Sequence, residues 1–215
     1  HNVILSVLIA EMLYEADECA QAEQMLRTCM RHVNSQGIAD PLITVYVLLS
    51  RICASRGEPA RANDLLAQLQ IVGRKFDLPR AVLSAHLEYA RQALLCGEID
   101  NAKKHLLFAD SPLWQHIEDC AFIANDTANY SIGYLRLLIR SGSAAQALAP
   151  LRTQLEKAER EQRHRRALKL RILLADALQC TGASKQAMRH LNLALDKAQA
   201  EGFVRTFLEE GESLT

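Results

Sequence analysis

The stretch GEPARANDLL, residues 57–66, decides the fold of this chain. Its glycine can take the left-handed conformation that ends a helix, and its proline suits the first turn of the next helix. An alanine follows the glycine by five residues, and a leucine follows the alanine by four. This spacing occurs at Gly57, Ala62 and Leu66, at Gly97, Ala102 and Leu106, at Gly142, Ala147 and Leu151, at Gly182, Ala187 and Leu191, and, with aspartate in place of glycine, at Asp17, Ala22 and Leu26.

The five copies follow one another at steps of 40, 40, 45 and 40 residues, and a period in this range indicates a stacked repeat array. Each copy predicts two helices joined by a tight turn, with the alanine where the helices approach most closely. We therefore predict an all-α fold, an α-α superhelix of about five helix-turn-helix repeats of ~40 residues. The repeats are expected roughly at residues 1–38, 39–78, 79–116, 117–163 and 164–203, before a short C-terminal segment, all in one domain.

Composition agrees with a helical array and narrows the classes of function. Nearly half of the 215 residues are apolar, and glycine and proline are few, so we expect no strand of consequence. The 25 basic and 25 acidic residues give a net charge of zero, which argues against DNA binding by this segment alone and against general attraction to anionic membranes.

The cysteines and histidines give no sign of a metal site. The six cysteines form no C-x-x-C pair, several fall at helix-packing positions, and their pattern favours a reducing, cytoplasmic compartment. The seven histidines show no H-E-x-x-H motif, and no nucleophile, base and orienting acid stand at catalytic spacing. We expect neither a metal, a cofactor nor an enzymatic activity in this chain. No apolar run reaches the ~18 residues of a membrane span, and no signal peptide opens the chain.

Two irregularities and both ends depart from the array. Five additional residues around Asp110–Trp114 shorten the second helix of repeat three, and we expect Trp114 to pack against neighbouring helices. Pro150 should kink or delay the second helix of repeat four. The apolar start of the chain and the absence of a polar closing helix indicate a piece of a longer protein.

A row of polar residues on the first helix of each repeat is the candidate binding surface. Residues six before each turn should face the concave groove, and they include arginine in three successive repeats. Arginine suits a carboxylate or phosphate, so we expect an anionic or hydroxyl-rich ligand there; alternatively, the arginines bridge adjacent helices through glutamate or backbone carbonyls. The candidate groove residues are Arg51, Arg91, Arg136, Arg140, Thr44, Ser84, Asn129 and Lys169.

A basic cluster lies at the turn into repeat five. It comprises Arg160, Arg163, His164, Arg165, Arg166, Lys169 and Arg171. Because Glu156, Glu159 and Glu161 largely offset its charge, we interpret it as a solvated helix junction rather than a partner contact.

The last sixty residues carry a resemblance to a known family. The segments EKAE at 156–159, RRAL at 165–168, ADAL at 175–178 and AEGFVRTFLEEG at 200–211 resemble the end of the tetratricopeptide-like (TPR-like) region of MalT-type, LuxR-class bacterial transcriptional regulators. The repeat pattern extends the resemblance over essentially the whole chain, and the unit of roughly 40 residues is also similar to that family.

The resemblance implies a sensor region between a nucleotide-binding switch domain and a C-terminal helix-turn-helix. Neither neighbour is in this chain, because no G-x-x-x-x-G-K-[ST] motif occurs and the DNA-reading module is expected just after Thr215. The implied partners are a small-molecule inducer or regulatory protein, the other domains of the same polypeptide, and a second copy through self-association. DNA would be bound only through the missing C-terminal domain, and no membrane partner is expected. The alternative is a general TPR adaptor that binds a partner peptide or helix in the same groove.

Overall fold

The computed structural model describes residues 2–117 and 123–210, and these residues form helices and turns without a strand. Five consecutive helix pairs make up the array. The first helices of the pairs, called A helices below, are α1 (Val3–Glu15), α3 (Ala39–Ser55), α5 (Pro79–Leu95), α8 (Tyr130–Arg140) and α10 (His164–Cys180). Their partners, called B helices, are α2 (Cys19–Gln36), α4 (Pro59–Lys75), α6 (Ile99–Ala109), α9 (Ala144–Arg160) and α11 (Ser184–Glu201). The predicted TPR-like helical superhelix is confirmed.

The turn inside each pair forms as its sequence predicts. Gly57 has φ +75°, its N–H bonds to the carbonyl of Ala54, and the N–H of Glu58 bonds to the carbonyl of Cys53. These bonds satisfy the last carbonyls of α3 and reverse the chain into α4, which begins at Pro59. Left-handed residues also occur at the corresponding positions Asp17, Gly97, Gly142 and Gly182.

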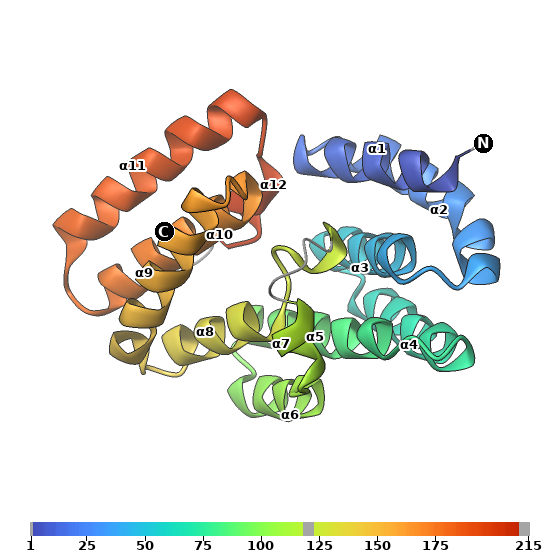
Figure 1. Cartoon of the computed structure of the whole chain (residues 1–215), viewed down its shortest axis with the longest axis horizontal. Helices are drawn as coiled ribbons and strands as arrows, with labels where there is room; N and C mark the ends of the chain where they lie inside the picture. Colours follow the sequence, from blue (N-terminus) through green and yellow to red (C-terminus); the bar gives the residue numbers. More distant parts are fainter. Residues whose placement is uncertain (1, 118–122, 211–215) are drawn as a thin grey trace.

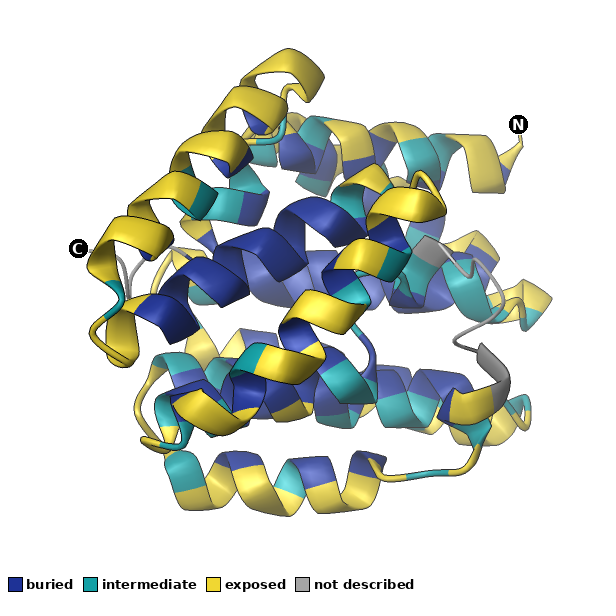
Figure 2. Ribbon diagram, turned by 60° about the vertical axis from the view of Figure 1, so that its left-hand side comes forward, coloured by how far each residue is buried: buried dark blue, intermediate teal, exposed yellow. Residues whose placement is uncertain are grey.

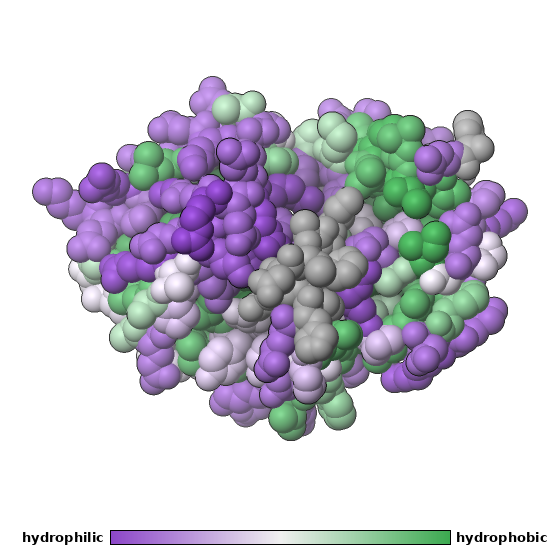
Figure 3. Space-filling view, in the orientation of Figure 1, coloured by the Kyte–Doolittle hydropathy of each residue, from purple (hydrophilic) through white to green (hydrophobic). Residues whose placement is uncertain are grey.

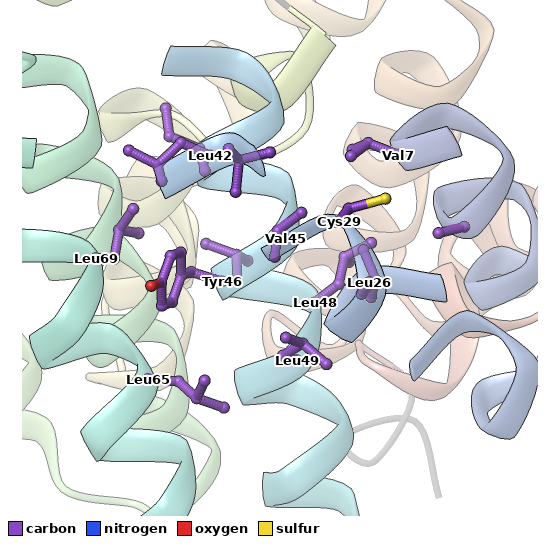
Figure 4. Packing of buried hydrophobic residues seen from close by; sticks show 14 of the residues in the cluster. Val7, Leu26, Cys29, Leu42, Val45, Tyr46, Leu48, Leu49, Leu65 and Leu69 are labelled. Carbon is purple, nitrogen blue, oxygen red and sulfur yellow. The ribbon is translucent and has the colours of Figure 1, made fainter. Parts of the chain in front are cut away.

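The alanine and leucine that recur in each repeat form the contact between the two helices of a pair. The alanines Ala22, Ala62, Ala102 and Ala147 are fully buried, and each is followed one turn later by a buried leucine. Figure 4 shows the same kind of packing between α1, α2, α3 and α4, where Leu26, Leu49 and Tyr46 point into shared cores. Each pair therefore buries its apolar face against the next, as expected of a repeat array.

The array curves until its last pair lies beside its first. Figure 1 shows the chain passing from α1 through α3, α5 and α8 to α10, after which the short helix α12 (Arg205–Leu208) lies near the end of α1. In Figure 2 the helices in the middle of the molecule are mostly dark blue, whereas the outer helices are yellow on their outward faces. The A helices thus surround the concave side.

The connection between the third and fourth pairs departs from the regular pattern. α6 has 11 residues where α4 has 17, and the chain continues through α7 (Leu113–Ile117) and a 3-10 turn, η1 (Ile123–Asn125), before α8. Trp114 is buried and its indole Nε1 donates to the carbonyl of Ala109 at 2.7 Å, so its expected packing against neighbouring helices is confirmed. The prediction that Pro150 delays the start of the second helix of repeat four is wrong, because α9 begins at Ala144 and continues through that proline to Arg160.

Candidate functional site

Four cationic side chains from four successive A helices gather on the concave side. Arg51 comes from α3, Arg91 from α5, Arg136 from α8 and Lys169 from α10. Between 2% and 8% of each residue is exposed, so these charges are taken out of water. A buried cation is tolerated only with an anionic partner, and the partners therefore define the site.

Glu88 of α5 is the first of these partners and joins two A helices. Arg51 donates to Glu88 Oε2 through Nη2 at 2.8 Å and through Nε at 3.0 Å. Arg91 donates to Oε1 of the same carboxylate at 2.7 Å and 2.9 Å. Burial acts to raise the pKa of Glu88, but Arg51 and Arg91 outweigh it and hold that pKa at about 2. Arg51 thus bridges α3 and α5 through a glutamate, which was one of the two interpretations of the row, whereas the contact of Arg91 with Glu88 lies within α5.

The other partners, Glu209 and Glu210, come from the end of the described chain. Arg51 Nη1 donates to Glu209 Oε2 at 3.1 Å, and Arg136 Nε donates to Glu210 Oε2 at 3.0 Å. Lys169 Nζ lies 3.2 Å from Glu210 Oε1 and 3.7 Å from Glu209 Oε2. Burial acts to raise the pKa of Glu210, but Arg136 and Lys169 outweigh it and bring that pKa down to about 2. Burial also acts to raise the pKa of Glu209, but Arg51 outweighs it and the pKa falls well below its ordinary range.

Sequence reasoning missed these two glutamates as groove residues. The available signal was the balance of charges. Three arginines and a lysine are expected on the groove face, and the glutamate nearest to them in the repeats is Glu88, whereas two adjacent glutamates follow the last repeat. Nothing in the helical period places residues 209 and 210, because their position depends on the curvature of the whole array.

The predicted polar residues of the groove have several different roles. Thr44 and Ser84 line a small cavity of about 40 Å³ beside the arginines. Ser84 Oγ accepts from Asn125 Nδ2 at 2.9 Å, and Asn125 Oδ1 is buried without a hydrogen-bond partner among the described residues. Asn129 caps α8 by accepting from the N–H of Ile132 at 3.0 Å. The cavity has room for one or two water molecules and presents an unused acceptor.

Arg140 stands apart from the other cations. It lies one turn beyond Arg136 at the end of α8, and its side chain is 24% exposed. Its Nη2 lies 3.8 Å from Asp176 of α10, so it bridges neighbouring A helices rather than lining the cavity.

The interpretation of the basic cluster as a solvated junction is wrong for most of its members. Lys169 lies in the groove, and Arg171 is buried and paired with Glu159. Arg166 donates to the carbonyl of Asp126 at 2.9 Å, and Arg163 also pairs with Asp126. These side chains pack against α9 and the connection before α8, which the local offset of charges along the sequence did not reveal.

Arg165 from the same cluster closes the array. Its Nη1 donates to Glu11 Oε1 and its Nη2 to Glu15 Oε1, both at 2.7 Å. Burial acts to lower the pKa of Arg165, but Glu11 and Glu15 raise it overall. Because Glu11 and Glu15 belong to α1 and Arg165 to α10, this charged contact ties the first pair of helices to the last.

Comparison with known protein families gives a match over the complete length. The family model described as the MalT-like TPR region matches residues 1–215. This chain belongs to the MalT-like TPR region family. Searches of curated proteins and of solved structures found no match.

The MalT-like TPR region has a polar concave site and no visible metal centre in the part described. Within residues 2–117 and 123–210, no three histidine, cysteine or acidic side chains are arranged to hold a metal ion. None of the helices in those ranges is both long and apolar enough to cross a membrane.

Proposed function

We propose that this MalT-like TPR region is the effector-sensing and protein-interaction domain of a LuxR-class bacterial transcriptional regulator. It binds an inducer or a regulatory protein in the concave groove and has no catalytic role. The signal passes to a switch domain and a DNA-binding domain outside this chain, and the regulator acts in the cytoplasm. Free thiols at Cys19, Cys29, Cys53, Cys96 and Cys180 support a reducing compartment.

The observation that carries this proposal is the convergence of Arg51, Arg91, Arg136 and Lys169 from four separate helix pairs. A ligand held by all four would contact most of the array at once. Each pair touches mainly its neighbours, so a ligand that changes the relative rotation of the pairs changes the curvature of the whole array. Arginine adds the planar fork of donors that recognises carboxylate and phosphate groups.

A general TPR adaptor that binds a partner peptide is the second candidate, and one observation favours it. The groove already holds a short acidic chain segment, the residues around Glu209 and Glu210, through their carboxylates. A peptide from another protein with neighbouring acidic residues would find the same cations. Binding of such peptides, with no response to metabolites, would favour the adaptor.

A thermal-shift screen of metabolites against this chain tests the sensor proposal. A ligand present at about 100 times its dissociation constant adds roughly 2.7 kcal/mol to the free energy of unfolding. The hit should lose its effect in Thr44→Val, which changes the cavity wall without removing a charge. Arg171→Ala is the matched control, because Arg171 is buried and ion-paired but lies outside the groove. A hit equally sensitive to both variants would contradict binding in the groove.

A further inference from the structure

We propose that Glu209 and Glu210 are the resident occupants of an anion site, and that a small dianion with two carboxylate or phosphate groups binds by taking their place. This inference deepens the proposed function, on which its biological role rests. The site itself stands on the geometry of the groove.

The two carboxylates occupy two anion positions that share one ammonium group. Lys169 Nζ lies within 3.2 Å of Glu210 and 3.7 Å of Glu209. Arg51 completes the position of Glu209, and Arg136 completes that of Glu210. An ammonium between two guanidinium groups is suited to a molecule with two anionic groups close together.

Four cations of the groove have only Glu88 as a carboxylate partner on α3, α5, α8 and α10 among the ion pairs described above. Arg51, Arg91, Arg136 and Lys169 contribute four positive charges, and Glu88 contributes one negative charge close to them. The two further negative charges come from Glu209 and Glu210. If the segment left with nothing in its place, the cations would lose two carboxylate partners and repel one another, so an anion that takes its place favours its departure.

The segment is held by charge pairs and hydrogen bonds and by one apolar contact, in which the partly buried Phe207 packs against the cluster of Leu168, Ile172, Ala194 and Ala198. Of the residues in α12 only Thr206 is buried, whereas Leu208 is 51% exposed. Elements with little buried apolar surface are the ones that open most readily. A competing anion therefore has to replace the charge pairs of Glu209 and Glu210 and loosen the contact of the partly buried Phe207.

Exchange at this site would release a link between the two ends of the array. The N–H of Val204 donates to the carbonyl of Glu15 at 2.8 Å. Glu15 Oε2 also accepts from Thr206 N and Oγ1, and the Tyr14 hydroxyl donates to Glu209. The residues from Val204 to Glu210 thus connect α1 to the groove. Binding of a ligand in the groove would be thermodynamically coupled to release of this segment.

Two double variants test the site. Glu209→Ala with Glu210→Ala removes both carboxylates and leaves space, whereas Glu209→Gln with Glu210→Gln removes the same charge and keeps the volume. Succinate and inorganic pyrophosphate serve as probes, with sodium chloride at equal ionic strength as the control. We expect the alanine pair to bind a probe roughly 10-fold or more tighter than the unmodified chain and to regain thermal stability on binding. The glutamine pair should gain less than the alanine pair, because its side chains still fill the two positions.

The tighter of the two probes identifies the anionic group that the site prefers. If neither probe binds the alanine pair better than it binds the glutamine pair, the anion site is overturned, including when the alanine pair is unfolded and no probe restores it. If probes bind but the metabolite screen gives no hit, the anion site stands and the proposal of a small-molecule inducer fails.

Hydrogen exchange of the unmodified chain tests the displacement itself. The amides of Val204 and Thr206 should exchange at least several-fold faster with saturating probe, while amides of α5 stay protected. A probe that binds while Val204 and Thr206 remain protected would overturn displacement.

Discussion

Arg136 and Glu210 form a buried ion pair between α8 and the end of the described chain, 74 residues apart in sequence. Their side chains are 7% and 2% exposed. This ion pair connects α8, in the fourth pair of helices, to a segment that also contacts α1. The fourth and the first pairs of helices are therefore linked through the end of the described chain.

Breaking this pair should destabilise the chain strongly. Arg136→Ala removes the bidentate partner of Glu210 in the groove, and removal of one partner from a buried pair costs about 3–5 kcal/mol. Urea unfolding followed by circular dichroism gives the free energy. Arg61→Ala breaks an exposed pair with Glu58 and should change little, so equal effects of the two variants would contradict the buried role.

Stability should fall on acidification through a defined window. The pKa values of Glu88 and Glu210 lie at about 2 in the folded chain, below their ordinary value of 4.5, and that of Glu209 is also lowered. Groups with a lowered folded pKa bind fewer protons when folded, so their contribution is complete above pH 4.5 and is lost as pH falls towards 2. Urea midpoints measured from pH 6 to pH 2.5 should therefore drop most steeply below pH 4.5. A flat profile in that window would mean that the carboxylates are not charge-paired.

The contact between α10 and α1 should control opening of the array. Arg165→Ala removes the cation that pairs with Glu11 and Glu15, which raises repulsion between the two carboxylates. We expect faster hydrogen exchange in α1 with unchanged exchange in α5. Arg171→Ala, which removes a buried arginine paired with Glu159, should leave α1 unaffected. The same acceleration in both variants would indicate general loss of stability.

The turn residues should respond according to backbone conformation alone. A side chain at Gly57 would meet nothing within 4 Å, so Gly57→Ala carries only the left-handed penalty of about 1–2 kcal/mol. Gln162 has φ +57° between α9 and α10, and Gln162→Gly should stabilise the chain by up to about 1 kcal/mol. Thermal unfolding of both variants checks the opposite signs. A neutral Gly57→Ala would argue against the left-handed turn.

The repeats could be predicted from sequence because their signals are local. Gly57, Ala62 and Leu66 lie within one turn and one helix face, where a helical period fixes the geometry. The same local logic placed Trp114 against its neighbours. It also brought Asn129 to the wall of the cavity, although the residue lies at the N-cap of α8 rather than within the helix, because the connection before α8 delays the start of that helix.

The site could be predicted only in part. The cations Arg51, Arg91 and Arg136 share one register position, so the repeat placed them on one row. Their partner Glu88 lies one turn away, and its role depends on the distance between α3 and α5. The partners Glu209 and Glu210 are set by the curvature of five pairs together, and no local pattern encodes that sum.

Apolar side chains also remain exposed on the outer face of α1. Ile4, Leu5, Ile9 and Met12 are between 40% and 72% exposed, and Figure 3 shows a hydrophobic patch over this helix. A patch of this kind is typical of an interaction surface. It lies on the helix that Glu209, Thr206 and Arg165 contact.

The most direct test of the account is the NMR signal of the arginine Nε–Hε groups during titration with the effector found in the screen. The account predicts that the signals of Arg51, Arg91 and Arg136 shift together with a single affinity, while that of Arg171 stays in place. Shifts confined to Arg171 or to other arginines outside the groove, with the three groove signals unchanged, would contradict the claim that the concave groove is the sensing site.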